Sequence, residues 1–147
     1  MISELKGNMH LLLVLLGALV YQNPSYDLEG KWLLRSYDAI DKIRSSPAYL
    51  FGDNDAKRAL EKQFEEILAK GEYSFGTDTL RYTDLEGGTV VYRRALWHMK
   101  EQVLYIDELD RPYHRQAMIH KASKDSLVLS PIIDGVAADS KMRFIRQ

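Results

Sequence analysis

The sequence contains no cysteine, and this absence excludes several kinds of chemistry. Disulfide bonds, zinc ribbons and thiol nucleophiles all require cysteine, and so does a lipid anchor on an N-terminal thiol. Neither sign of charge is in excess, because the chain has 20 Lys and Arg residues and 21 Asp and Glu residues. Nucleic acid and anionic membrane surfaces are therefore not expected as partners, and the length of 147 residues suits one domain.

The chain also lacks an apolar run long enough to span a membrane as a helix. Its longest run, residues 11–20, is about half of the roughly 20 residues that such a helix needs. A short apolar run near the start of a chain, followed by turn-forming residues, is typical of an export signal. We expect a signal peptide over 1–25, a domain over 26–147 and a periplasmic or extracellular location without a lipid anchor. A first buried strand and an uncleaved anchor are the alternatives for the apolar run.

Signatures of enzymes, metal sites and cofactors are missing as well. The sequence has no G-x-S-x-G elbow, no phosphate-binding P-loop, and no H-x-H or H-E-x-x-H pair among its four histidines. We therefore expect no enzymatic activity, no metal site and no cofactor. The richest polar stretch, Asp107 to His114, places carboxylates beside a histidine and is interpreted as a solvated loop. An enzyme of unfamiliar type that uses this stretch for acid–base chemistry stays open as a rival interpretation.

One segment has the periodicity of an amphipathic helix, which we expect over about 54–70. Apolar residues recur there on one helical stripe: Leu60, Phe64, Ile67 and Leu68. Asp53 is a suitable N-cap, because its carboxylate can accept the free amide protons of the first turn. Gly71 is expected as the left-handed residue that ends the helix. The charged residues on the other face are expected to be solvated: Lys57, Arg58, Glu61, Lys62, Glu65 and Glu66.

Most of the remaining sequence alternates between apolar and polar residues with a period of two, which indicates strands. The expected strands cover residues 32–40, 72–76, 80–83, 89–99, 103–107, 115–122, 126–130 and 141–146. Loops are expected over 84–88, 108–113 and 131–139. Short strands in sequential hairpins favour a mainly β fold, an eight-stranded antiparallel up-and-down barrel, because closure removes the exposed sheet edges.

Several short motifs follow one another along the chain: Leu28-Glu29-Gly30-Lys31-Trp32, Gly71-Glu72-Tyr73-Ser74-Phe75 with Thr77-Asp78-Thr79, Trp97 ahead of Val103-Leu104-Tyr105-Ile106, Leu127-Val128-Leu129, and Met142-Arg143-Phe144-Ile145-Arg146. In this order they resemble the small lipocalin-like proteins exported by Bacteroidetes-type bacteria, over residues 28–147. The resemblance implies an eight-stranded antiparallel barrel that is exported, usually without a known ligand or enzymatic activity. It also implies that Gly30 and Trp32 close one end of the barrel. Arg143 or Arg146 of the last strand would then stack on the Trp32 indole by a cation–π contact.

Aromatic residues on the expected strands are the remaining candidates for binding. The residues we select as ligand-binding candidates are Trp97, Tyr73, Phe75, Tyr92, Arg93 and Tyr105. Arg93 shares a strand face with Ala95 and Trp97, and an inward arginine is a sign of a pocket because burying an unpaired charge is costly. The opposite register of that strand gives the same argument for Arg94.

An eight-stranded barrel has room either for a filled core or for one small ligand. We expect non-covalent binding of a small, partly apolar ligand inside the barrel. The alternative is a protein-interaction module, in which the barrel is filled and the loops at its rim contact a protein partner. In that case Ile132, Ile133 and Val136 would be exposed apolar contacts.

Overall fold

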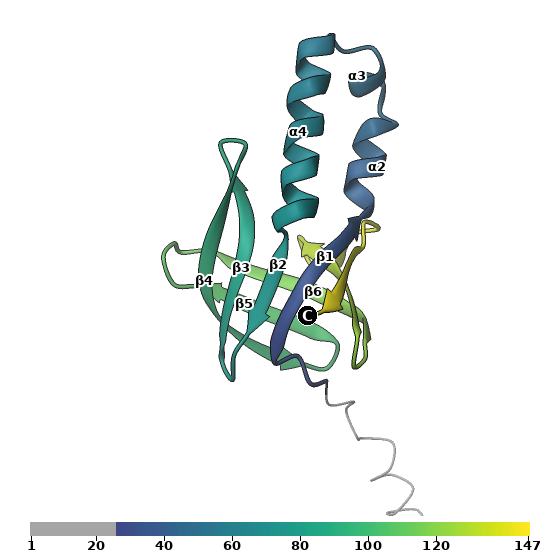
Figure 1. Cartoon of the computed structure of the whole chain (residues 1–147). Helices are drawn as coiled ribbons and strands as arrows, with labels where there is room; N and C mark the ends of the chain where they lie inside the picture. Colours follow the sequence, from purple (N-terminus) through teal and green to yellow (C-terminus); the bar gives the residue numbers. More distant parts are fainter. Residues whose placement is uncertain (1–25) are drawn as a thin grey trace, which may run out of the picture.

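A computed structural model describes residues 26–147, which form a β-barrel with a helical arm at one end (Figure 1). The expected signal peptide over 1–25 lies outside the described residues. The elements, in chain order, are β1 (Gly30–Tyr37), α2 (Asp38–Arg44), α3 (Pro47–Leu50), α4 (Asn54–Lys70), β2 (Glu72–Phe75), β3 (Thr79–Glu86), β4 (Thr89–Lys100), β5 (Val103–Glu108), β6 (His114–Ala122), β7 (Ser126–Ile133), β8 (Val136–Ala137) and β9 (Met142–Arg146).

Antiparallel pairing between neighbours carries the sheet all the way round the barrel. Strands β1 to β6 follow one another in chain order, β6 pairs with β7, and β7 pairs with β9. The ring closes where β9 pairs with β1, with Trp32 opposite Arg146. The short strand β8 pairs only with β7 and lies outside the ring. The expectation of an eight-stranded antiparallel up-and-down barrel is therefore confirmed.

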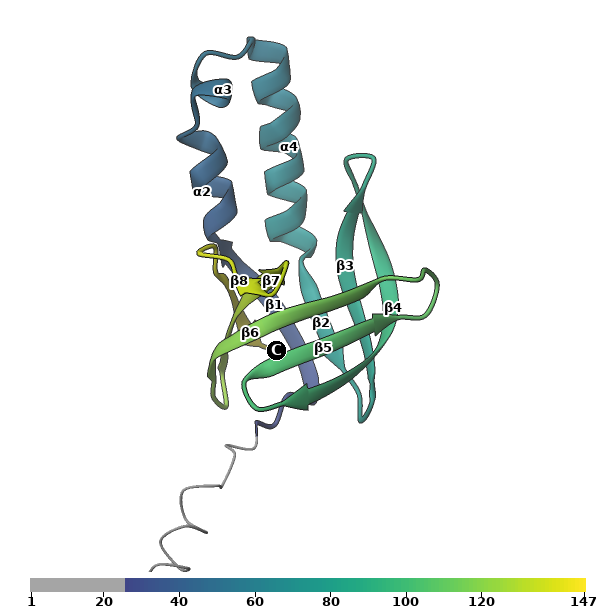
Figure 2. The same cartoon turned by 180° about the vertical axis from the view of Figure 1, so that it is seen from behind.

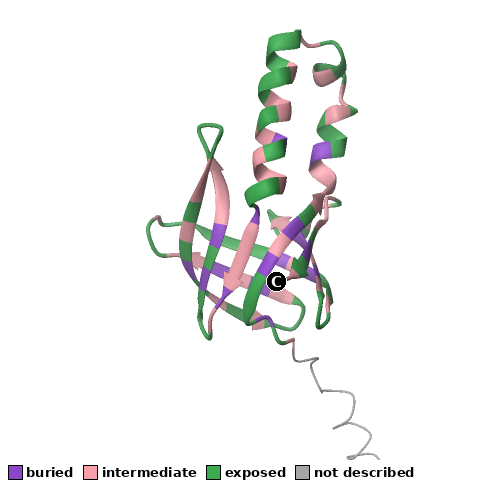
Figure 3. Ribbon diagram, in the orientation of Figure 1, coloured by how far each residue is buried: buried purple, intermediate pink, exposed green. Residues whose placement is uncertain are grey.

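The core fills the end of the barrel at which β1 begins (Figure 3). Trp32 is completely buried there, and its Nε1 donates a hydrogen bond of 2.9 Å to the carbonyl oxygen of Leu28. The Arg146 guanidinium carbon lies 4.2 Å from the centre of the Trp32 ring. Arg146 also donates to the backbone carbonyl oxygens of Asp27 and Lys124, at 2.9 and 2.7 Å. A cation, an indole and three backbone carbonyls thus seal this end.

Gly30 and the two candidate arginines have distinct positions at this seal. A Cβ atom on Gly30 would lie 2.9 Å from Nη1 of Arg146, so the glycine leaves room for that side chain. Arg143 points elsewhere and pairs with the carboxylate of Asp38 at 2.6 Å. Of the two arginines, Arg146 is therefore the one that stacks on Trp32.

The helical arm contains three helices where the sequence analysis expected one (Figure 2). Helix α4 occupies the expected residues 54–70, and the Asp53 carboxylate accepts the amide proton of Ala56 at 2.8 Å. Helices α2 and α3 were not expected, and the strand predicted over 32–40 ends at Tyr37. Within residues 26–147, no helix has the length and the apolar composition needed to cross a membrane.

Contacts between α2 and α4 explain why the arm holds together away from the barrel. Ile40 of α2 and Phe64 of α4 are both buried. The Arg44 guanidinium donates to both carboxylate oxygens of Glu61, at 2.9 and 2.8 Å, and the Tyr49 hydroxyl donates to the same carboxylate. These hydrogen bonds lower the pKa of Glu61 to about 2. The expectation that Glu61 is merely solvated is therefore wrong.

The end of α4 differs from the expectation for a physical reason. Gly71 has φ −59° and ψ 119°, so it is not left-handed. The chain passes directly into β2, and the Gly71 carbonyl oxygen accepts the amide proton of Leu34 at 2.8 Å. An added Cβ would lie 2.5 Å from the carbonyl oxygen of Ile67 and 2.7 Å from the Leu34 Cβ. Glycine is needed here for close packing of α4 on β1.

Two of the expected loops are largely strand. Strand β3 runs to Glu86 and turns at Gly87 and Gly88, so the loop predicted over 84–88 is wrong except for its glycines. The loop predicted over 131–139 contains the end of β7, a turn at Asp134 and Gly135, and β8. Both turn residues have positive φ, 51° and 77°, as a two-residue hairpin turn requires.

Candidate functional site

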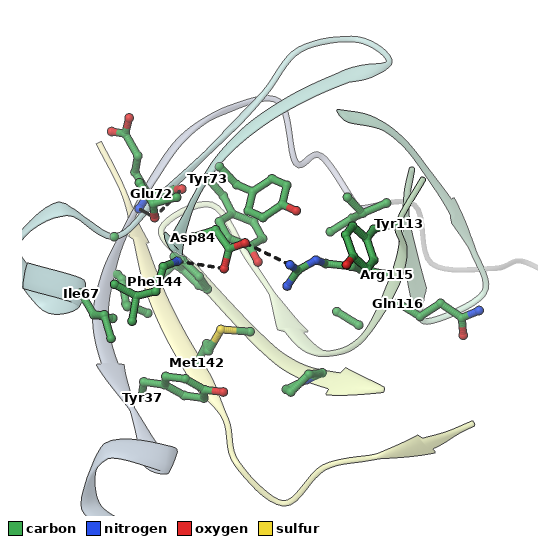
Figure 4. A pocket seen from close by; sticks show the side chains of 18 of the residues that line it. Tyr37, Ile67, Glu72, Tyr73, Asp84, Tyr113, Arg115, Gln116, Met142 and Phe144 are labelled. Atoms are coloured by element: carbon green, nitrogen blue, oxygen red, sulfur yellow. Dashed lines mark hydrogen bonds and ion pairs between the residues drawn. The ribbon is translucent and has the colours of Figure 1, made fainter. Parts of the chain in front are cut away.

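A cavity of about 560 Å³ lies at the end of the barrel opposite Trp32 (Figure 4). Its size falls in the range of pockets that hold small molecules, roughly 300–1,000 Å³. The walls come from the end of β1, the start of β2, the β3–β4 hairpin, the start of β6, the end of β7 and the start of β9. Most of the apolar lining consists of Leu34, Tyr37, Ile67, Leu85, Val90, Ile106, Ala117, Pro131, Ile132, Ile133, Met142 and Phe144.

An aromatic layer separates the cavity from the filled core. The ring of Tyr73 lies 5.4 Å from the ring of Tyr82, 5.0 Å from that of Phe144 and 6.0 Å from that of Phe75, measured between centroids. Tyr73, Tyr82 and Phe144 all line the cavity. The interior of this barrel is thus solid on one side of the layer and hollow on the other.

The hydroxyl of Tyr73 makes no hydrogen bond to any residue between 26 and 147. Burial raises the pKa of Tyr73 to about 12, and the nearby Asp84 carboxylate adds to this effect while Arg115 opposes it. The phenol is therefore neutral at physiological pH and keeps its proton. It is a hydrogen-bond donor held at the surface of a cavity.

Three arginines and two carboxylates form an ion-pair network in one wall. The Asp84 carboxylate lies 3.0 Å from Nη2 of Arg115, 3.3 Å from Nη2 of Arg111 and 3.4 Å from Nε of Arg93. Glu108 accepts from Arg111 at 2.7 and 2.8 Å and from Arg115 at 3.1 Å. The side chain of Glu108 is only 1% exposed, so its negative charge is stabilised by these arginines and not by water.

Opposing effects act on the titration of Glu108. Burial favours the neutral acid, but hydrogen bonds from Arg111 and from the Tyr82 hydroxyl, together with the charge of Arg115, lower the pKa of Glu108 to about 2. Burial and the bond to Glu108 raise the pKa of Tyr82 well above its usual value. Glu108 is therefore ionised at neutral pH, and the phenol beside it keeps its proton.

The ligand-binding candidates from the sequence are scattered over the barrel, and Tyr73 is the one that lines the cavity. Phe75 and Trp97 pack against each other in the filled half, with ring centroids 5.1 Å apart. Tyr92 and Tyr105 are on the outer surface: the Arg81 guanidinium lies 4.0 Å from the Tyr92 ring centre, and Tyr105 stacks on His98. Arg93 belongs to the ion-pair network but is set back from the cavity.

Several cavity residues were not selected from the sequence. Asp84 was assigned to a loop, and Tyr37 was placed inside a strand rather than at its end. Arg115 carries a signal that was overlooked, because it alternates with Ala117 and Ile119, which are both buried. An inward arginine at position 115 is a sign of a pocket for the same reason as at position 93, because an unpaired charge is costly to bury.

Two solved structures are similar to this one at low sequence identity. A lipocalin-like protein from Bacteroides uniformis is 17% identical, with a TM-score of 0.49 over 82% of this chain and 98% of that chain. An uncharacterized protein from Bacteroides eggerthii is 13% identical, with a TM-score of 0.47 over 82% of this chain and 100% of that chain. No protein-family model and no curated protein match the sequence.

Two of the histidines between residues 26 and 147 each contact one polar side chain. His114 Nδ1 lies 2.6 Å from Asp107 Oδ1, so the rival acid–base stretch does bring a histidine and a carboxylate together. The His114 side chain is 80% exposed at the edge of the cavity, and the Asp107 side chain is about half exposed. His120 Nε2 lies 2.7 Å from the Ser130 hydroxyl, but Ser130 is completely buried. Over residues 26–147, no group of three His, Asp or Glu side chains is arranged to hold a metal ion.

Proposed function

We propose that this protein binds a small, partly apolar molecule in the cavity at the helical end of its barrel. The observation that supports this function is a cavity of about 560 Å³ whose apolar walls include a neutral phenol donor and a fixed ion pair, Asp84 with Arg115. Apolar walls drive binding through burial of surface, at about 25 cal/mol per Å² before the entropy costs of association. A few fixed polar groups then orient the ligand.

Replacing Met142 by tryptophan tests this function, since Met142 points into the cavity (Figure 4). We expect the neutral fluorescent dye N-phenyl-1-naphthylamine to bind the unaltered protein at one saturable site. In Met142→Trp the indole takes up cavity space, and the dye affinity should fall by about tenfold or more. Fluorescence titration measures both affinities, and circular dichroism checks that the variant is folded.

A matched control is Tyr92→Trp, which places the same indole on the outer surface of the barrel. This variant should bind the dye as the unaltered protein does. Failure of the dye to bind the unaltered protein, or equal binding by Met142→Trp, would contradict the proposed function.

A second candidate is an interaction with a protein partner at the rim. Ile133 and Val136, on the β7–β8 hairpin, are 62% and 70% exposed, and Tyr113 across the cavity is about half exposed. Ile133 and Tyr113 also line the cavity, so they border the space that the ligand would enter. The dye titration separates the two candidates. If the protein only contacts a partner at the rim, the dye need not bind in the cavity, and Met142→Trp need not change the dye affinity.

Export of the protein to the periplasm or the outside of the cell is part of the same proposal. It is supported by the apolar run of residues 11–20 and the turn-forming residues behind it. We expect the mature protein from its source cells to begin near residue 26. Intact-mass measurement of the protein in the periplasmic and medium fractions tests this, and a chain that retains residues 1–25 would contradict cleavage.

A further inference from the structure

We propose that the ligand of this cavity carries a carboxylate on an apolar body, and that Arg115 and Tyr73 bind the carboxylate. This inference rests on the proposed function, because it names the ligand class of the same cavity.

Arg115 has donors left over after its protein contacts are made. Its Nε donates to Glu108 at 3.1 Å and its Nη2 donates to Asp84 at 3.0 Å, whereas Nη1 contacts no acceptor within residues 26–147. Two ion pairs hold the guanidinium in place, and its side chain is 44% exposed where it lines the cavity. The guanidinium is thus a rigid donor with a free edge directed at the cavity.

The second donor lies beside the first. Figure 4 shows the hydroxyl of Tyr73 on the same side of the cavity as the Arg115 guanidinium. The phenol is neutral and has no acceptor among the described residues, so its proton is free for a ligand. A planar guanidinium edge and one phenol proton suit the two oxygens of a carboxylate, and charge-assisted bonds of this kind are stronger than neutral ones.

The charge of this wall favours an anion. Arg93, Arg111 and Arg115 share the inward carboxylates of Asp84 and Glu108, which leaves one positive charge in excess within the wall. Glu86 also contacts Arg93, but its side chain is two-thirds exposed at the tip of the β3–β4 hairpin, where water screens it. Of these arginines, Arg115 is the one that lines the cavity.

The remaining walls suit the apolar body of the ligand. Tyr37, Ile67, Met142 and Phe144 line the side of the cavity next to β1, β9 and the end of α4 (Figure 4). None of these side chains carries a charge, so a second charged group on the ligand would be buried without a partner there. Glu72 also lines the cavity, but its carboxylate is paired with Lys31 at 3.0 Å. The lining therefore favours one charged end and one apolar end.

Three probes with the same twelve-carbon chain test this inference by calorimetry on the full domain. They are dodecanoate, dodecanol and dodecyltrimethylammonium, which present an anion, a neutral hydroxyl and a cation. We expect dodecanoate to bind about tenfold or more tighter than dodecanol. Arg115→Gln should abolish this preference, so that dodecanoate binds no tighter than dodecanol. Arg94→Gln, which breaks an exposed ion pair with Asp110, is the matched control and should keep the preference.

Each other outcome decides against the inference. Equal binding of the three probes, or tightest binding of the cation, would overturn the carboxylate ligand while leaving the proposed function intact. A preference for dodecanoate that survives both Arg115→Gln and Tyr73→Phe would overturn the assignment of these residues. If Arg115→Gln does not fold, Tyr73→Phe and the comparison of probes on the unaltered protein decide alone. Failure of dodecanol and the neutral dye to bind would overturn the proposed function itself.

Discussion

Replacing Trp32 by alanine is expected to lower the free energy of unfolding by about 3–5 kcal/mol, the usual cost of removing a large buried aromatic side chain. The indole is completely buried and donates a hydrogen bond to Leu28. It is also the surface against which Arg146 packs. Urea unfolding followed by fluorescence measures the change, because Trp97 remains as a reporter in the variant.

Tyr92→Ala provides the comparison for this variant. It removes a large aromatic side chain from the outer surface, where Tyr92 is about half exposed, and should cost well under half as much as Trp32→Ala. A loss below about 1 kcal/mol for Trp32→Ala would show that the barrel does not depend on the indole for closure of this end.

Replacing Glu108 by glutamine is expected to destabilise the protein by about 3 kcal/mol at neutral pH. Removing one partner of a buried ion pair typically costs about 3–5 kcal/mol, and the lower end applies because the side chains of Arg111 and Arg115 are partly exposed to water. Asp110→Asn is the matched control: it removes a carboxylate from the exposed pair with Arg94 and should cost far less than Glu108→Gln.

The pH dependence of this loss follows from the pKa of Glu108. Folding lowers that pKa from 4.5 to about 2, so the folded state favours the ionised form. The stabilisation is complete above pH 4.5 and is lost as the pH falls toward 2. Unfolding free energies of the unaltered protein and Glu108→Gln should therefore converge over this range. If the difference in unfolding free energy between the two proteins stays constant down to pH 2, the role assigned to the Glu108 charge is contradicted.

The sequence predicted the barrel because its strands alternate strongly and follow one another in hairpins. Helix α4 was predicted because apolar residues, among them Phe64, recur on one helical face over several turns. Helix α2 was missed because seven residues with one buried apolar side chain, Ile40, give no such repeat. Its acidic first turn and basic last turn are the only local signals, and they are weak. Asp134-Gly135 is a strong signal for a hairpin turn. Pro131, three residues earlier, argues against a strand there, and the segment was therefore predicted as a loop.

The cavity was harder to predict than the fold. Whether a barrel is hollow depends on how side chains from strands far apart in sequence meet, as Tyr73, Tyr82 and Phe144 do in the aromatic layer. Alternation places a residue inside or outside, but it does not say at which height along the barrel the residue lies. Phe75 and Trp97 point inward as expected, and they lie on the filled side of the layer.

The pairing of the first strand with the last has a consequence for biosynthesis. Neighbouring strands can pair as soon as they leave the ribosome, but the contact of Trp32 with Arg146 must wait for β9. Closing so long a loop is slow compared with forming local hairpins. Until the ring closes, the inner faces of the strands are accessible to other chains. Intermolecular association during synthesis is therefore a hazard for this architecture.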